Sequence, residues 1–253
     1  VRNRIEHLHA AGHSTDKLEL IVMGGTFPST PVQYQNWFVK RCLDASNERT
    51  SKTFAAAKSK AEKAPNRIIG TTFETRPDFC TEQHINRMLN FGGTRVELGV
   101  QTLSDALYHK INRMHTVKDV ADATARLKDS AFKACYHMML GLPESSAEGD
   151  LENFRTAFGD GRFKPDMLKI YPCSVIENTP LYKDWKHGRY KPLSTEEATE
   201  LIAKIKRITP RWVRIMRVQR DTPSTVISAG VEKSNLRQLA QQKLAEHGVR
   251  CNC

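Results

Sequence analysis

Six short apolar runs alternate along the chain with amphipathic stretches, and this alternation constrains the fold more than any other feature. Runs rich in Val, Ile, Leu and Phe are typical of buried strands, and apolar residues every three or four positions are typical of helices. The predicted strands are 18–24, 67–73, 94–100, 132–139, 166–172 and 212–218. The predicted helices are 31–44, 81–91, 103–112, 117–130, 148–158 and 194–208. Repeated strand–helix units predict parallel strands with right-handed crossovers, in a doubly wound sheet or a (β/α) barrel, whole or partial.

Two segments depart from this alternation. Residues 46–66 are rich in Lys, Ala and Ser with few apolar anchors, so we expect an exposed, positively charged insertion that is helical in part. Residues 221–253 contain one amphipathic stretch, predicted to be a helix at 233–246, and end in "CNC". We therefore predict a strand–helix domain at 1–220 and a tail from residue 221 onward that does not follow the strand–helix alternation.

The composition is that of a folded protein. With 39% hydrophobic and 26% charged residues, the chain can bury a core. It has no apolar run of about 18 residues and no signal-peptide pattern, so we expect no membrane contact and no secretion. Six scattered cysteines argue against a secreted disulfide framework and favour a reducing, cytoplasmic compartment. A chain that begins with Val1 in place of Met is interpreted as a fragment.

The charge balance indicates a partner class. Lys and Arg number 39 against 28 Asp and Glu, for a net charge of +11. A surplus of this size is expected of a protein that binds a polyanion, and nucleic acid is the leading candidate.

Unusual residues follow several of the predicted strands. In folds of this class, ligands bind at the carboxyl ends of the strands. Gly24-Gly25-Thr26 follows the first strand, where two glycines allow the backbone to approach a ligand and to present N–H groups. Glu74, Arg76 and Asp78 follow the second and could hold a polar ligand or simply form a surface ion cluster. Gln101 follows the third, and its amide suits a sugar hydroxyl or a base edge.

Further candidate residues lie near these ends. Glu97 is costly to bury without a partner, for which Arg95 and Arg76 are candidates. Arg113 lies between two predicted helices and could reach the strand ends, whereas His137 lies in an apolar strand and fits an ordinary core histidine. The pair Cys251 and Cys253 is half of a zinc-ligand pattern, which needs four ligands.

The segments "LELIVMGGTF", "ETRPDFCTEQHINRML", "TRVELGVQT", "NRMHTVKDV" and "SAGVEKSNLRQL" resemble, in order, the catalytic subunit of Elongator, a tRNA-modifying complex. The resemblance implies a radical S-adenosylmethionine (SAM) domain, folded as a partial (β/α) barrel, at 1–220. It also implies a linker at 221–253 toward an acetyltransferase domain. The implied activity is addition of a carboxymethyl-type group to C5 of the wobble uridine of tRNA, with acetyl-CoA, S-adenosylmethionine and a [4Fe-4S] cluster as cofactors.

Roles for single positions follow from the same resemblance. Gly24, Gly25 and Thr26 are expected to receive the methionine part of S-adenosylmethionine. Arg76 is expected either to bind the same cofactor or only to brace its turn. Glu74 and Gln101 are expected near its ribose, Arg113 near its carboxylate, and His137 at the same rim. Lys17 matches a lysine that the family uses toward acetyl-CoA, although by itself it reads as a surface residue. The implied partners are tRNA and other Elongator-type subunits or a second copy of the chain.

The sequence also departs from the family pattern. The cysteine triad that binds the cluster in the family is absent. We expect it upstream of Val1, together with the first strand of the family's barrel, which would precede the strand predicted at 18–24. Asn178 stands where family members commonly have glycine. Two alternatives stay open: a non-catalytic tRNA-binding platform that has lost the cluster, and a different radical enzyme such as a relative of the oxygen-independent coproporphyrinogen oxidases.

Overall fold

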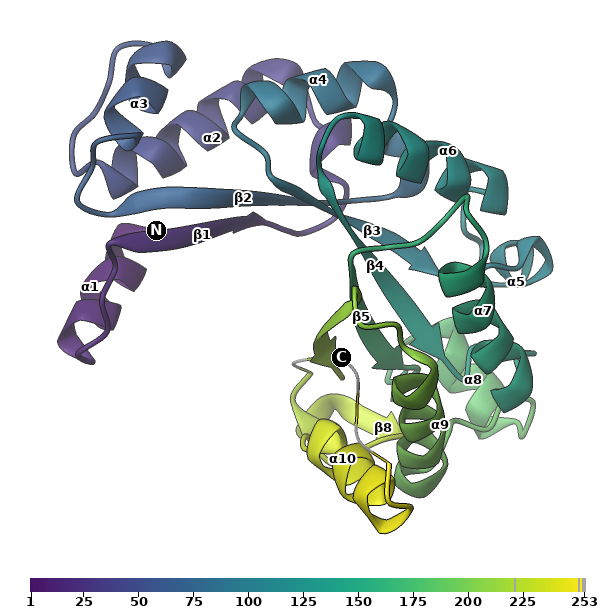
Figure 1. Cartoon of the computed structure of the whole chain (residues 1–253). Helices are drawn as coiled ribbons and strands as arrows, with labels where there is room; N and C mark the ends of the chain where they lie inside the picture. The colour runs from purple at the N-terminus through teal and green to yellow at the C-terminus, as the bar shows by residue number, and fades with distance from the viewer. Residues whose placement is uncertain (221, 250, 252–253) are drawn as a thin grey trace. The chain divides into compact units, whose positions relative to one another are not determined.

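A computed structural model describes residues 1–220, 222–249 and 251 (Figure 1). Its principal sheet has six strands in the order β1-β2-β3-β4-β5-β7, and β6 and β8 form a second, two-stranded sheet. The chain divides into two compact units, residues 1–97 with 126–132, and residues 98–125 with the described residues from 133 onward. The predicted strand–helix alternation is confirmed, since each of the six predicted strands overlaps a strand of the principal sheet.

The first unit is built around the parallel pair β1 and β2. Its elements are α1 (Arg2–Ala10), β1 (Lys17–Val22), η1 (Phe27–Ser29), α2 (Val32–Ser46), α3 (Phe54–Ala61), β2 (Arg67–Thr75), η2 (Pro77–Phe79), α4 (Glu82–Asn90) and the start of β3 (Arg95–Gln101). The register places Val22 beside Phe73, so β1 and β2 end close together. Phe27 of η1 stacks on Phe73 with ring centroids 6.0 Å apart, which joins the turn after β1 to the core.

The segment 46–66 differs from the exposed insertion that we predicted. It contains α3, which packs against α2 (Figure 1), and the side chains of Ala57 and Ala61 are buried. Small alanines let the two helices approach closely, and Phe54 meets Phe91 edge to face at 5.6 Å. The prediction of a helix was correct. The prediction of an exposed segment holds in part, because Lys60 and Lys63 are exposed whereas Ala57, Ala61 and Ala64 are buried.

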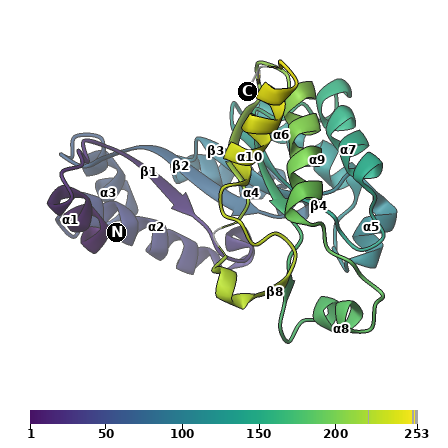
Figure 2. The same cartoon turned by 90° about the horizontal axis from the view of Figure 1, so that it is seen from below.

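The second unit holds the remaining elements. They are the end of β3, α5 (Asp105–Lys110), most of α6 (Val117–Asp129), β4 (Lys133–Leu140), α7 (Ala147–Gly159), β5 (Met167–Pro172), β6 (Val175–Ile176), α8 (Pro180–Lys186), α9 (Thr195–Ile208), β7 (Arg214–Val218), η3 (Ser224–Val226), β8 (Ile227–Ala229) and α10 (Leu236–Glu246). The strands β4, β5 and β7 pair in parallel. Helix α9 lies against α7 and α10 (Figure 2). It begins with a capping box of Ser194 and Glu197, which satisfies two backbone N–H groups.

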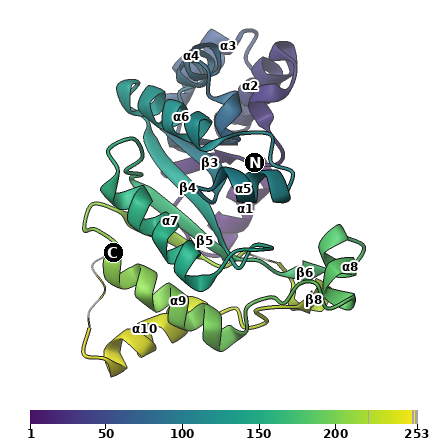
Figure 3. The same cartoon turned by 90° about the vertical axis from the view of Figure 1, so that its right-hand side faces the viewer.

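The end of the chain is integrated with this unit. β8 pairs with β6 in antiparallel fashion, and α10 packs on α9 (Figure 3). The helix predicted at 233–246 is confirmed as α10, whereas α8, β6 and β8 were missed. Asn178, in the turn before α8, adopts φ +62°, a left-handed conformation that asparagine tolerates better than most residues. The domain boundary at residue 220 stays a prediction.

Four cysteines, Cys42, Cys80, Cys135 and Cys173, are reduced and buried. Burial raises the pKa of the Cys80 thiol to about 12, so it is a poor nucleophile at neutral pH. Among the described residues, no helix combines the length and the apolar character needed to cross a membrane.

Candidate functional site

The turn after β1 exposes its backbone. Gly24 and Gly25 have φ values of +105° and +62°, which other residues seldom adopt. A Cβ atom added at either glycine would meet no atom within 4 Å. Thr26 ends the turn, and its carbonyl accepts the backbone N–H of Ser29 at 2.9 Å and the Ser29 hydroxyl at 2.7 Å. The turn is therefore fixed at Thr26 and open at the glycines, as a backbone that receives a ligand must be.

The end of β2 lies next to this turn, because β1 and β2 are paired in parallel. Glu74 is half-buried near the end of the strand. Arg76 donates from Nε to the Asp78 carboxylate at 2.9 Å, and its guanidinium lies 5.3 Å from the centre of the Phe79 ring. The Asp78 carboxylate raises the pKa of Arg76 further, so the guanidinium stays charged. Arg76 is thus committed within its own turn, and Glu74 directly follows Phe73, the residue that pairs with Val22 at the end of β1.

Glu97 is fully buried on β3, and Arg95 lies two residues before it on the same face of the strand. The Arg95 Nε lies 3.4 Å from a Glu97 carboxylate oxygen, which confirms Arg95 as the partner expected for Glu97. Arg95 also forms an ion pair with Glu19 of β1, and Glu19 accepts the Thr72 hydroxyl at 2.9 Å. These charged groups tie the strands of the first unit together.

In the second unit, Gln101 and Arg113 gather around the end of β3. Gln101 has φ +70°, an uncommon conformation for a residue other than glycine. The Arg113 guanidinium donates to the carbonyl of Gly99 at 2.7 Å. Tyr108 of α5 donates its hydroxyl to the carbonyl of Thr102, which anchors the segment that follows Gln101. An uncommon backbone conformation held by surrounding contacts is a frequent property of ligand sites.

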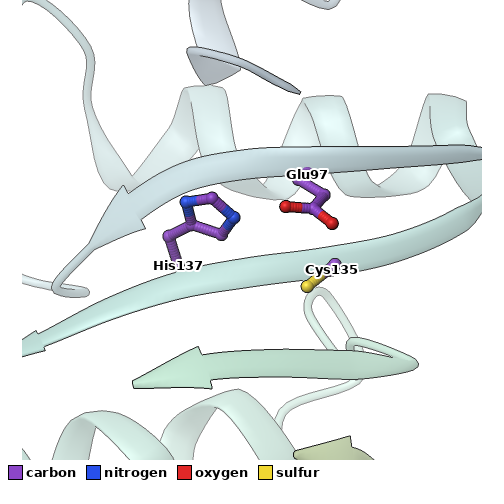
Figure 4. Close-up of side chains that lie close together, drawn as sticks. All are labelled: Glu97, Cys135 and His137. Carbon is purple, nitrogen blue, oxygen red and sulfur yellow. The ribbon is translucent and has the colours of Figure 1, made fainter. Parts of the chain in front are cut away.

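His137 is half-buried on β4 and meets the ring of Tyr171 on β5 edge to face, with centroids 5.6 Å apart. Cys135 and His137 are two residues apart and therefore share one face of β4. Figure 4 shows both side chains together with Glu97, and one ligand-type atom from each lies within 4.8 Å of the others. Glu97 already has Arg95 as an ionic partner, and we assign no metal to this group.

The end of β4 has a feature that sequence patterns did not reveal. The buried carboxylate of Asp150, on α7, accepts the backbone N–H of Gly141 at 2.7 Å. Tyr190 donates its hydroxyl to the carbonyl of the same glycine at 2.7 Å. Burial raises the pKa of Asp150 to about 6, against the opposing effect of the Gly141 N–H. The partners are 9 and 49 residues apart in sequence, so no local pattern could have indicated them.

Lys17 is the exposed first residue of β1, opposite the end that carries Gly24 and Gly25. Cys251 is half-buried, and Cys253 lies outside the described residues. The zinc half-site and the acetyl-CoA role of Lys17 both stay predictions.

Comparisons with known proteins define the class. The model of the radical SAM superfamily matches residues 3–154, and that of the radical SAM C-terminal domain matches residues 165–246. The chain therefore belongs to the radical SAM superfamily and has its fold, a partial (β/α) barrel of parallel strands with outer helices.

The relatives are more specific. The chain is 52% identical over 252 residues to a protein of Methanocaldococcus infernus named tRNA uridine(34) acetyltransferase, covering 100% of this chain and 47% of the relative. It is 44% identical to human Elongator complex protein 3 over 250 residues, covering 99% of this chain and 46% of that protein. The solved structure of archaeal Methanocaldococcus infernus Elp3 with an N-terminal deletion has 52% identity and a TM-score of 0.96, covering 99% of this chain and 59% of that one.

These relatives confirm the resemblance to the Elongator catalytic subunit that was stated from sequence motifs. The chain spans about half the length of the relatives it matches.

The described residues fit one of the two cofactors that the superfamily implies. The open backbone at Gly24 and Gly25, beside Glu74, suits the charged and hydroxyl groups of S-adenosylmethionine. The four reduced cysteines do not suit an iron–sulfur cluster, because each is buried on or beside a different element and they form no closely spaced triad.

Proposed function

We propose that this chain is the radical SAM part of an enzyme that adds a carboxymethyl-type group to C5 of the wobble uridine of tRNA, with acetyl-CoA as the donor. The observation that supports it best is the open glycine turn after β1 next to Glu74, in a chain 52% identical to a tRNA uridine(34) acetyltransferase. The net charge of +11 is consistent with a tRNA substrate.

In this proposal each predicted residue has a binding role. The backbone around Gly24, Gly25 and Thr26 receives the methionine part of S-adenosylmethionine. Glu74 accepts from ribose hydroxyls, and Gln101, with its amide, both donates and accepts there. S-adenosylmethionine supplies a 5′-deoxyadenosyl radical when it is bound and reduced in enzymes of this superfamily.

Arg113, His137 and Arg76 have supporting roles. Arg113 is placed at the end of β3 by the bond from its guanidinium to the Gly99 carbonyl, and it is assigned to the carboxylate of S-adenosylmethionine. His137, held against Tyr171, contributes a wall of the site. Arg76 is engaged with Asp78, and its predicted cofactor contact therefore competes with that ion pair.

The proposal extends to the cluster, acetyl-CoA and zinc. The cluster ligands lie upstream of Val1, and Lys17 acts toward acetyl-CoA. Cys251 and Cys253 contribute half of a zinc site. The protein works in the cytoplasm with tRNA and with other Elongator-type subunits or a second copy of itself.

The test begins with S-adenosylmethionine binding by equilibrium dialysis, on the full-length protein and its variants. Glu74→Ala and Gln101→Ala are each expected to weaken binding about tenfold, because each removes a hydrogen bond worth about 1.5 kcal/mol. Their tRNA affinity should be unchanged.

A matched pair tests Arg76. If Arg76 touches the cofactor, Arg76→Ala weakens binding and Asp78→Ala does not, whereas equal effects mean that the ion pair only braces the turn. The full-length protein with a filled cluster should then cleave S-adenosylmethionine when tRNA and acetyl-CoA are present. Tight tRNA binding without cleavage would contradict the proposal and favour a non-catalytic tRNA-binding platform.

A further inference from the structure

A cavity of about 540 Å³ lies in the second unit, beyond the end of β5. It is bordered by β6, α8, η3 and β8, of which β6, α8 and β8 lie together in Figure 3. Its volume is within the usual range of about 300–1,000 Å³ for ligand pockets. Its polar lining is supplied by Glu177, Lys186, Thr225 and Ser228, and its aromatic lining by Tyr182 and Trp185. None of these six residues has a role in the function proposed above.

The two aromatic rings are held firmly in place. Tyr182 and Trp185 are on α8 with ring centroids 5.6 Å apart, and both are half-buried. They pack against a buried cluster that contains Val175 and Tyr190. The hydroxyl of Thr179 accepts the backbone N–H of Tyr182 at 3.2 Å and caps the helix at its start. The rings are therefore a preformed surface, with one part on the core and one part lining the cavity.

A cation lies over these rings. The Lys186 ammonium is 5.0 Å from the centre of the Trp185 ring and 5.4 Å from that of Tyr182. Cation–π contact holds the ammonium at the cavity. Lys183 and Arg189 extend the positive charge along α8 and the turn that follows, although Arg189 is paired with Asp184.

The simplest explanation is that α8 merely completes a small apolar core and that the cavity is a surface hollow. Two observations favour a ligand. Large aliphatic side chains, Ile176 and Val226, remain 38% and 45% exposed at the cavity. Aromatic faces, a cation, a carboxylate and two hydroxyls also converge on one space, which a packing role does not require.

We propose that this cavity binds one unstacked nucleotide of single-stranded RNA. The base lies against Trp185 and Tyr182, and Lys186 meets a backbone phosphate. The Glu177 carboxylate accepts a base N–H, and the hydroxyls of Thr225 and Ser228 contact the base edge. Glu177 argues against a phosphopeptide or another purely anionic ligand, since its carboxylate would repel such a ligand.

The inference rests on the proposed function, which supplies a tRNA substrate with a single-stranded anticodon loop. It deepens that function by adding a second point of contact with the RNA, from elements that follow β5. The occupant is another nucleotide of the RNA that carries the reacting uridine, and the cavity works as a positioning site.

The test measures binding of an anticodon stem-loop RNA with uridine at the wobble position to the full-length protein, by fluorescence anisotropy at several salt concentrations. Trp185→Ala should weaken binding about 5- to 100-fold, the range expected for one lost base–aromatic stack. Trp185→Phe, which keeps an aromatic face, should stay within about threefold of the parent. Trp212→Ala is the matched control, because Trp212 is 60% exposed and lies outside the cavity.

A second variant separates binding from folding. Lys186 is exposed, so Lys186→Gln leaves the core intact. Loss of one phosphate contact should reduce the slope of log affinity against log salt by about 0.7, whereas Trp185→Ala should leave that slope unchanged. In addition, 4-thiouridine placed in the loop should crosslink under ultraviolet light to peptides that contain α8.

The outcomes distinguish the two proposals. If the parent binds the stem-loop but Trp185→Ala matches Trp212→Ala and α8 forms no crosslink, the cavity assignment is wrong and the tRNA-modifying function stands. If the parent itself binds no stem-loop RNA, both proposals fail together.

Discussion

The turns after β1 and β4 both contain glycine in a left-handed conformation, yet they differ in their surroundings. At Gly24 and Gly25 an added Cβ atom would meet nothing within 4 Å. At Gly141, with φ +67°, it would lie 2.8 Å from Cγ of Leu193. The same residue type therefore allows access of a ligand in one turn and close packing in the other.

The polar contacts differ in the same way. In the turn after β4, the Gly141 N–H bonds to Asp150 and its carbonyl accepts the Tyr190 hydroxyl, so both backbone groups are used inside the protein. In the turn after β1, the hydrogen bonds converge on Thr26. A glycine whose backbone is enclosed supports stability, whereas a glycine whose backbone faces open space suits binding.

The largest effect is expected from Gly141→Ala. Alanine at φ +67° is strained by about 1–2 kcal/mol, and the contact with Leu193 forces a further adjustment of about 1–3 kcal/mol. We expect the free energy of unfolding to fall by about 2–5 kcal/mol, and urea denaturation of the protein measures this decrease.

Leu193→Ala in the Gly141→Ala background is the control, because it removes the atoms that clash. The double variant should recover only the part of the lost stability that comes from the contact with Leu193, and not the part that comes from backbone strain. A Gly141→Ala protein as stable as the parent would show that the turn after β4 is as permissive as the turn after β1.

An intermediate effect is expected from Asp150→Asn. The pKa of Asp150 in the folded protein, about 6, is above its ordinary value of 3.8, so the folded state binds more protons between these pH values. The contribution of this group to the free energy of unfolding should therefore fall by at most about 3 kcal/mol as the pH rises from about 4 to 6. It should stay low at higher pH. The neutral amide lacks this titration and should be more stable than the parent at pH 7.5 by about 1–2 kcal/mol.

The two proteins should have the same stability near pH 4, where Asp150 is protonated. Denaturation curves at pH 4, 5, 6 and 7.5 measure the difference directly. A constant difference across this range would mean that the carboxylate is charged throughout and that the N–H of Gly141 outweighs burial.

Much of the fold could be predicted because its signals are local. The strand 67–73 was predicted from its apolar run, and the helix 194–208 from its apolar periodicity and from the polar residues at its first turn. The predicted bounds agree with those of β2 and α9 to within a few residues. The two-residue strand β6 has too little length for any period, and α8 begins at a proline after an asparagine turn. Such elements depend on partners elsewhere in the chain, β8 and the core around Val175, which periodicity does not reveal.

The candidate site could be predicted in position more than in role. Parallel strands bring their ends to one edge, so Gly24 and Glu74 could be placed near each other from sequence alone. The cofactor assigned to them came from the family resemblance. The contact of Asp150 with Gly141 was not predictable, because it depends on how α7 packs after β4.

The smallest effect on stability, and the sharpest contrast, is expected from Gly25→Ala. Its φ of +62° costs about 1 kcal/mol in alanine, but no atom lies near the new methyl group, so the fold should tolerate the change. The same methyl group occupies the open space in which a ligand would meet the backbone. We therefore expect the affinity for S-adenosylmethionine, measured by equilibrium dialysis, to decrease at least tenfold. The free energy of unfolding should decrease by only about 1 kcal/mol. Gly12→Ala is a suitable control, since Gly12 has φ +78° and equally free surroundings but precedes β1 instead of following it. Equal cofactor affinity in the two variants would mean that the openness of the β1 turn has no part in binding, and that the contrast with the β4 turn concerns packing alone.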